Sequence, residues 1–216
     1  MKLYQYLTES KAIEIEYEDA EKEYNKVYNK CKKYFGLIRT KKPLYRTVNQ
    51  KMLGSNIYFK KKVRQDRKSR SAITRGTEFE KLINKKLEEM GHNRRDKSVS
   101  TTPNYNHALM FSKTGKEVYY FLPIGDFSYS WCPSKDWNFG NLNWNTRIFT
   151  QMRMELEGQT TEMGFEWVLE RFDDMLSSVK TDKGFDIAYK EGFEMWFKCK
   201  EYYLIDPNSE LGQMVE

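Results

Sequence analysis

The chain has 216 residues, of which 39% are hydrophobic, 31% charged and 15% aromatic, and its formal net charge is +6. This balance is typical of a soluble globular protein of one domain, or of one domain with a helical appendage. No run approaches the roughly 18 apolar residues of a membrane span, and the first ten residues lack the apolar core of a signal peptide, so we expect a cytoplasmic protein. Three scattered cysteines and two histidines argue against a disulfide framework, a metal site and a histidine-based hydrolase.

The first predicted element is a helix from about residue 8 to residue 35. Its apolar and aromatic residues recur every three or four positions, with Glu and Lys between them; they are Tyr17, Ala20, Tyr24, Val27, Cys31 and Tyr34. We assign residues 1–40 to an N-terminal helical region and residues 41–216 to the main domain, and expect both to form one compact unit. A short strand over residues 43–48 follows and contains Arg46.

The next feature is a basic segment between residues 60 and 75, which contains eight positively charged residues and one negatively charged residue, Asp66. The positive residues are Lys60, Lys61, Lys62, Arg64, Arg67, Lys68, Arg70 and Arg75. Such a patch can attract a nucleic acid or a phosphorylated ligand. A solvated loop explains the same charge run equally well.

A second helix is predicted between residues 77 and 90, because Thr77 and Glu80 form a capping box and Gly91 supplies a stop. Beyond Gly91 the pattern changes to strands and turns. The predicted strands cover residues 98–101, 117–123, 127–131, 194–199 and 202–205, with a hairpin turn at Gly125 and Asp126. A third helix is predicted over residues 161–179. Helices first and strands mostly later predict an α+β fold.

Three separated segments carry residues suited to chemistry. Arg46 lies between apolar neighbours on its short strand, where an arginine tends to point into a cleft and needs an anionic partner. Ser100 lies in a hydroxyl-rich strand end that also contains Thr101 and Thr102. Glu194 begins an aromatic strand directly after a glycine turn.

In this order, the three segments resemble the Arg-Ser-Glu class of ADP-ribosyltransferases, and most closely the small members carried by tailed bacteriophages. The resemblance extends from about residue 4 to residue 205. Each motif alone is weak, and their shared order is moderately specific. The motifs are residues 6–10, Leu44-Tyr45-Arg46, residues 67–70, residues 94–101, residues 121–125 and Cys132-Pro133-Ser134-x-Asp136-Trp137.

The resemblance implies two short, mainly antiparallel sheets packed at an angle, with the N-terminal helical region against one side and an NAD cleft between them. It implies that ADP-ribose moves from NAD to a macromolecular acceptor, a host protein or a nucleic acid, in the cytoplasm of the infected host. Glu194 would stabilise the oxocarbenium-like charge that develops on the ribose. Arg46 would bind the pyrophosphate. Ser100 would hold Glu194 or the ribose, with Thr101 and Thr102 shaping the same strand end.

Some positions depart from the family pattern and leave alternatives open. In arginine-modifying members the residue two before the catalytic glutamate is usually Glu, whereas Gly192 stands there in this chain, so the acceptor is open. A competing register makes Glu191 the catalytic carboxylate. Phe111 and Tyr105 are both candidates for an aromatic residue that stacks on nicotinamide. Two other functions fit the sequence: a nucleic-acid-binding phage protein with an inactive cleft, and an NAD glycohydrolase.

Overall fold

The computed structural model describes residues 12–48, 56–63, 78–110, 117–133, 173 and 176–216, with side chains of the helix at 78–89 described from Ile83 onward. The chain divides into two compact units, which are described separately. Unit 1 comprises Met1–Arg64, Asn104–Phe127 and Cys199–Glu216, and unit 2 comprises Gln65–Pro103 and Ser128–Lys198. Residues of the expected N-terminal region therefore belong to a larger unit that also contains the C-terminus.

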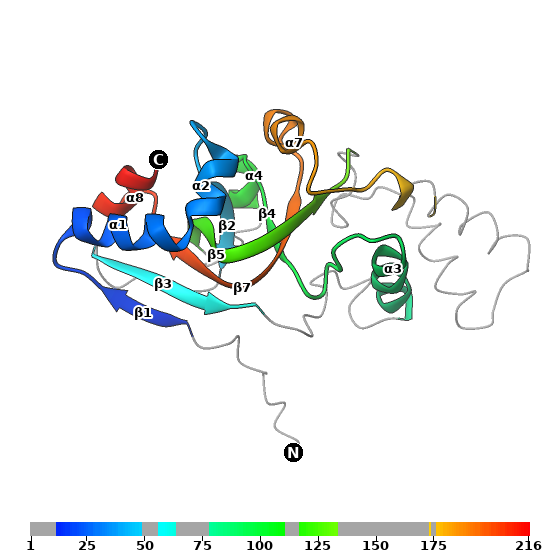
Figure 1. Cartoon of the computed structure of the whole chain (residues 1–216), viewed down its shortest axis with the longest axis horizontal. Coiled ribbons are helices and arrows are strands. Elements are labelled where there is room, and N and C mark those ends of the chain that lie inside the picture. The colour runs from blue at the N-terminus through cyan, green and yellow to red at the C-terminus, as the bar shows by residue number, and fades with distance from the viewer. Residues whose placement is uncertain (1–11, 49–55, 64–77, 111–116, 134–172, 174–175) are drawn as a thin grey trace, which may run out of the picture. The chain divides into compact units, whose positions relative to one another are not determined.

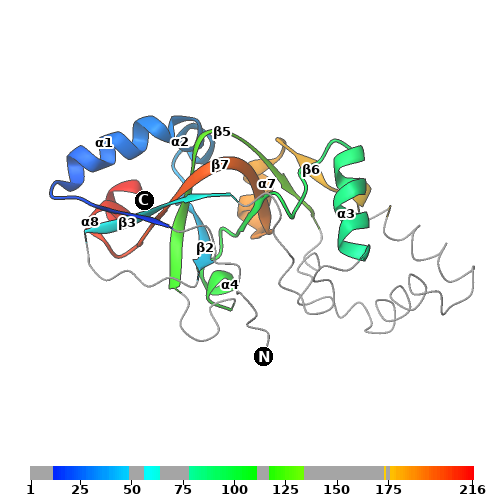
Figure 2. The same cartoon turned by 90° about the horizontal axis from the view of Figure 1, so that it is seen from below.

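Unit 1 is built on an antiparallel sheet. Its complete elements are β1 (Ile13–Glu16), α1 (Ala20–Lys30), α2 (Lys32–Ile38), β2 (Leu44–Val48), β3 (Ile57–Lys62), α4 (Tyr105–Met110) and α8 (Glu210–Val215). The strands β5 (Glu117–Trp131) and β7 (Met195–Ile205) contribute residues to both units. The order of hydrogen-bonded strands is β1-β3-β7-β5-β2, and Figures 1 and 2 show α1 and α2 along one side of these strands.

The core of unit 1 forms where α1 and α2 meet the sheet. Val27, Tyr34 and Ile38 project from the two helices and are buried. The ring of Tyr34 packs edge-on against Phe121 of β5, with centroids 6.4 Å apart, and its hydroxyl accepts a hydrogen bond from the Leu44 backbone N–H at 2.9 Å. Asp19 begins α1 by accepting a hydrogen bond from the backbone N–H of Lys22 at 2.9 Å, as an N-cap does.

Within the residues that the structure describes, unit 2 combines short strands with the helices α3 and α7. Its complete elements are α3 (Glu78–Glu89), β4 (Val99–Thr101), β6 (Lys180–Thr181) and α7 (Phe185–Glu191). β4 pairs antiparallel with the first residues of β7 (Figure 1), and β6 pairs antiparallel with the last residues of β5 (Figure 2). The predicted glycine stop is confirmed here: α3 closes at Gly91, which has a φ of 78°, and the N–H of His92 donates to the carbonyl of Leu87 at 2.7 Å.

The α+β class is confirmed, and three finer expectations are wrong. The chain over Ile13–Glu16 is the strand β1, because its two isoleucines and two glutamates alternate with period two, and helix α1 begins only after Asp19. The expected turn at Gly125 and Asp126 lies inside the continuous strand β5, where Gly125 adopts a φ of 68°. β7 is likewise one strand instead of two.

Continuous β5 and β7 have a consequence for the sheets. The described strands form one seven-stranded sheet, with β4 and β6 pairing outside the main path, where two short sheets were expected. The predicted third helix falls almost entirely on residues outside the described ranges. Within those ranges, the helices are all too short or too polar to cross a lipid bilayer.

Candidate functional site

The pairing of β4 with β7 brings two of the sequence-predicted residues to one face. Ser100 lies opposite Trp196, and Thr101 lies opposite Met195. Opposite residues of an antiparallel pair point to the same face, and faces alternate along each strand. Ser100 and Trp196 therefore share one face, and Glu194, two residues before Trp196, lies at the end of this face, because Arg95 contacts both the Trp196 ring and Glu194. We call this the carboxylate face.

The opposite face of the same ladder belongs to the core. Thr101 is 3% exposed, and its hydroxyl donates to the carbonyl of Met195 at 3.0 Å. Met195 and Phe197 are fully buried. Thr102, the next residue of the strand end, is also buried.

Arg95, which was not among the predicted site residues, is the residue that holds Glu194. Its Nη2 donates to Oε1 of Glu194 at 3.1 Å, and its Cζ lies 5.6 Å from the centroid of the Trp196 ring. The two charged side chains are 19% and 15% exposed, so the ion pair is largely screened from solvent but still reached by it. One guanidinium thus contacts both the carboxylate and the indole of the carboxylate face.

The main chain around Arg95 is held by helix α3. Oδ1 of Asn84, which is 2% exposed, accepts hydrogen bonds from the backbone N–H groups of Arg95 at 2.8 Å and of Asp96 at 3.3 Å. Trp196 is held in a similar way, since its Nε1 donates to the carbonyl of Asn93 at 2.8 Å. The backbone of Arg95 and the ring of Trp196 therefore both have fixed anchors.

A second aromatic pair fixes the chain just before Glu194. Phe193 stacks on Trp131 with ring centroids 5.6 Å apart and an interplanar angle of 14°. Trp131 is 1% exposed, and its Nε1 donates to the carbonyl of Lys183 at 2.7 Å. Glu194 thus directly follows the buried Phe193 and comes two residues before the buried Trp196. Packing of these two aromatic residues restricts the backbone of Glu194.

Helix α7 separates the two glutamates that competed in the sequence. Gly192 ends the helix with a φ of 75°, and the N–H of Phe193 donates to the carbonyl of Ala188 at 3.0 Å. Glu191 lies in the last turn of the helix and is exposed, whereas Glu194 directly precedes the first residue of β7. The strand start that favoured Glu194 is therefore where the sequence placed it.

The charged residues near Glu194 differ in how many of their polar atoms are hydrogen-bonded. Arg94, next to Arg95, is bound by Asp96 at 3.0 and 2.7 Å and by Glu88 at 3.0 Å. The hydrogen bond with Asp96 and the charges of both carboxylates raise the pKa of Arg94. For Glu194, Arg95 supplies the one hydrogen bond from the residues that the structure describes, and it reaches Oε1 alone. Oε2 is thus available to a ligand as far as these residues are concerned.

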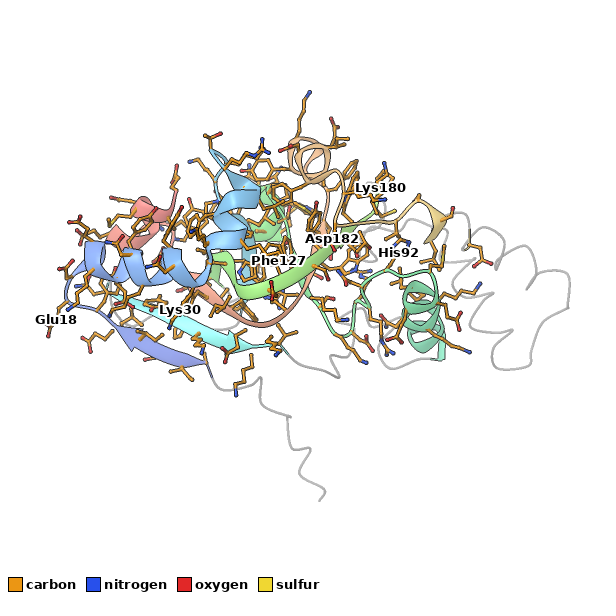
Figure 3. All side chains as sticks on the ribbon, in the orientation of Figure 1. Glu18, Lys30, His92, Phe127, Lys180 and Asp182 are labelled. Carbon is orange, nitrogen blue, oxygen red and sulfur yellow. The ribbon has the colours of Figure 1, made fainter. Side chains whose placement is uncertain are left out.

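A hydrogen-bonded polar cluster supports the same part of unit 2 from β5 and β6. Asn93 accepts a hydrogen bond from Ser128 at 2.8 Å, and its backbone N–H donates to Ser130 at 3.1 Å. The Ser130 and Thr181 hydroxyls lie 2.6 Å apart, and Nδ1 of His92 lies 2.9 Å from the latter. Burial lowers the pKa of His92. Figure 3 labels His92 together with Lys180 and Asp182, which flank Thr181.

The remaining predicted residues lie elsewhere. Arg46 belongs to unit 1, where it is 9% exposed on β2 and its Cζ lies 6.0 Å from the Tyr202 ring centroid. Tyr105 is also in unit 1, 43% exposed on α4, with its ring edge-on to Tyr45. Phe111 lies outside the described residues.

The basic segment is a strand where the structure describes it. Lys60, Lys61 and Lys62 end β3; Lys60 pairs with Glu201 at 2.7 Å, Lys61 is 4% exposed, and Lys62 faces solvent. Lys61 is therefore not part of an accessible surface. The other members lie outside the described residues: Arg64, Arg67, Lys68, Arg70 and Arg75.

The chain was compared with protein-family models, with curated proteins and with solved structures, and none of them matches. Evidence for the function of the site therefore comes from the chemistry of its own side chains. A carboxylate with an open oxygen, neighbouring hydroxyls and a guanidinium over an indole are groups that can bind a sugar hydroxyl, a phosphate and a planar ring.

Proposed function

We propose that the chain is an ADP-ribosyltransferase, which transfers ADP-ribose from NAD to a macromolecular acceptor and releases nicotinamide. The observation that supports the proposal is that Ser100 lies opposite Trp196 on the β4–β7 ladder and that Arg95 contacts both the Trp196 ring and Glu194, two residues before it. The Arg-Ser-Glu order in the sequence supports it independently. The proposed place of action is the cytoplasm of a phage-infected host.

The reaction that we propose breaks the bond between C1′ of the ribose and the ring nitrogen of nicotinamide, and the bonding electrons leave with nicotinamide. The acceptor supplies a lone pair for the new bond to C1′ and loses a proton. In this proposal the Glu194 carboxylate opposes the positive charge that grows on the ribose. Its Oε2 can accept a hydrogen bond from a ribose hydroxyl, since the described residues leave that oxygen open.

The neighbouring groups have supporting roles in the proposal. Ser100 stands on the same face as Glu194 and offers a hydroxyl without adding charge. Buried Thr101 and Thr102 hold the strand end in register. Arg46 remains the predicted ligand of the pyrophosphate, since a guanidinium offers a fork of donors that matches phosphate oxygens.

The test is nicotinamide release from NAD by purified protein, measured for the natural chain, Glu194→Gln and Glu191→Gln. Each substitution removes one negative charge, and the two positions are only three residues apart. Each variant therefore controls for the effect that the loss of charge by itself has in the other. We expect Glu194→Gln to lower the rate by on the order of 10²–10³, the usual cost of one preorganised electrostatic group, and Glu191→Gln to change it by less than about threefold. Equal rates for all three proteins would remove Glu194 from the mechanism, and the reverse ranking would make Glu191 the catalytic residue.

The acceptor is identified by adding NAD labelled in the adenylate part to a host lysate, with and without RNase and protease. Label that protease removes indicates a protein acceptor, and label that nuclease removes indicates a nucleic acid. Nicotinamide release without any labelled macromolecule would make the chain an NAD glycohydrolase. Tight nucleic-acid binding that weakens steeply with salt, together with no NAD binding in calorimetry, would instead favour a nucleic-acid-binding protein.

A further inference from the structure

Positive charge is concentrated on α1 and α2 of unit 1. From Lys22 to Lys42 the chain contains eight positively charged residues and one negatively charged residue, Glu23. Glu23 is 6% exposed, and its two carboxylate oxygens are bound at 2.6 Å by Lys26 and at 2.6 Å by the Tyr58 hydroxyl. The exposed acidic residues of this part of the chain all come before Lys22; they are Glu14, Glu16, Glu18, Asp19 and Glu21.

The charge therefore changes sign along α1. Figure 3 labels Glu18, just before the helix, and Lys30, its last residue, at opposite ends of it. Three of the eight positive residues form ion pairs: Lys26 with Glu23, Lys33 with Asp126, and Lys42 with Glu216. Within the described part of the chain, four other positive side chains are exposed and form no ion pair; they are Lys22, Lys30, Lys32 and Arg39. Several unpaired cations on one short segment attract an anionic partner.

An aromatic cluster lies at the junction of the same two helices. The ring of Tyr28, in the last turn of α1, stacks on Phe35 of α2 with centroids 5.1 Å apart and an interplanar angle of 30°. Tyr24 contacts both rings, with its centroid 5.9 Å from Tyr28 and 6.4 Å from Phe35. Tyr28 is 38% exposed, and the other two rings are half-buried. Lys30 ends α1 and Lys32 begins α2, so unpaired cations and partly exposed rings occupy the same stretch of chain.

We propose that this junction binds single-stranded nucleic acid. The junction surface consists of the three rings and the two lysines that flank the end of α1: Tyr24, Tyr28, Phe35, Lys30 and Lys32. An unpaired base stacks on the cluster at Tyr28, its most exposed ring, and Lys30 and Lys32 contact phosphates of the same strand. The inference goes beyond the proposed function and does not depend on NAD chemistry.

The combination of rings and cations favours a single strand over other anions. Every unpaired base offers a flat face to an aromatic ring, so stacking tolerates any sequence, and lysines follow the backbone electrostatically. In a duplex, each base face is covered by the neighbouring base pair. An acidic peptide satisfies the lysines but leaves the stacked rings without a role.

The experiment measures binding of a fluorescent oligothymidylate of about 12 nucleotides, within the usual range of single-strand sites, by anisotropy. The proteins are the natural full chain, Tyr28→Leu, Tyr28→Phe, the double variant Lys30→Gln/Lys32→Gln, and Lys190→Gln. We expect Tyr28→Leu to weaken binding by about 5- to 50-fold, the loss of one base stack. Tyr28→Phe keeps the ring and stays within about twofold of the natural chain.

The salt dependence tests the lysines separately. Each phosphate contact to a single strand contributes about 0.7 to the slope of log affinity against log salt concentration. The double variant should therefore have a slope smaller by about 1.4 than that of the natural chain. Lys190 is a matched control, because it is an exposed lysine in the last turn of α7 as Lys30 is in the last turn of α1. Lys190→Gln should keep the natural slope and an affinity within about twofold.

Several outcomes overturn the proposal. Tyr28→Leu that binds as tightly as the natural chain, or a double variant with the natural slope, places any binding on another surface, such as the basic segment between residues 60 and 75. Equal affinity for the strand annealed to its complement, or equal displacement by polyglutamate at the same charge concentration, shows attraction without stacking. If Tyr28→Leu does not fold, the slope of the double variant and the duplex comparison decide. NAD cleavage is read in a separate assay, so either proposal can fail while the other holds.

Discussion

The glycine at the start of α7 should be one of the least replaceable residues of unit 2. Gly184 has a φ of 67°, and a Cβ added there would lie 2.9 Å from Cζ2 of Trp131. That indole cannot move away, because it is 1% exposed, stacks on Phe193 and donates to the carbonyl of Lys183. Gly184→Ala therefore combines backbone strain with a steric clash.

The expected magnitude follows from these two contributions. The left-handed conformation costs a non-glycine residue about 1–2 kcal/mol, and overpacking a well-packed core costs about 1–3 kcal/mol. Gly184→Ala should thus lower the free energy of unfolding by roughly 2–5 kcal/mol, a large part of the typical 5–15 kcal/mol of a natural protein. Gly192, at the other end of α7, has a φ of 75° and nothing within 4 Å of an added Cβ. Gly192→Ala should cost only about 1–2 kcal/mol.

The assay is urea unfolding at 25 °C, followed by tryptophan fluorescence, for the natural chain and both glycine variants. The difference between the variants isolates the contact with Trp131, since backbone strain is common to both. If Gly184→Ala is no more destabilising than Gly192→Ala, Trp131 is not fixed against α7. The reasoning that Trp131 and Phe193 hold the chain before Glu194 would then be refuted.

Further predictions concern unit 1 and the polar cluster. Tyr58→Phe removes a 2.6 Å hydrogen bond to buried Glu23 and should lower the free energy of unfolding in urea by about 1.5–3 kcal/mol. Tyr28→Phe, on a half-exposed ring, should lower it by less than about 0.5 kcal/mol. Equal losses of stability in the two variants would contradict a stabilising role of the Tyr58–Glu23 hydrogen bond. Burial lowers the pKa of His92 below its ordinary 6.5, so the unfolded chain binds the proton more readily and stability should fall as pH drops below that value. His92→Gln should flatten the slope of unfolding free energy against pH below 6.5. An unchanged slope would contradict the contribution of buried His92 to this pH dependence. Burial raises the pKa of both Cys31 and Cys199 to about 12. Neither thiol should therefore react with a disulfide reagent at pH 8 until urea unfolds the chain. Rapid labelling of either cysteine in the folded protein would contradict this prediction.

Much of the fold was readable from local patterns. The capping and stop signals predicted α3 to within a residue or two, and the apolar run around Arg46 predicted β2. Glycine misled at Gly125, where the residue accommodates a positive φ inside a long strand instead of ending it. Helical spacing in the N-terminal region likewise hid β1, because Ile13 and Ile15 fit both a strand and the start of a longer helix.

The candidate site was predictable only in part, for a physical reason. Strand alternation and order along the chain pointed to Ser100 and Glu194, and the pairing of β4 with β7 brings them to one face. Arg95 lies in the irregular chain between α3 and β4, where no period tells which of two adjacent arginines turns toward a distant carboxylate. That choice depends on Asn84 holding the local backbone, a contact made across 11 residues.

The most direct test of the central claim is a crystal structure of Glu194→Gln with NAD bound. The substitution keeps the shape of the side chain and slows cleavage, so the intact dinucleotide can be trapped. We expect the nicotinamide ribose to lie within hydrogen-bond distance of residue 194, on the same side of the β4–β7 ladder as Ser100. NAD bound away from that face, or Glu194→Gln cleaving NAD as fast as the natural chain, would contradict it.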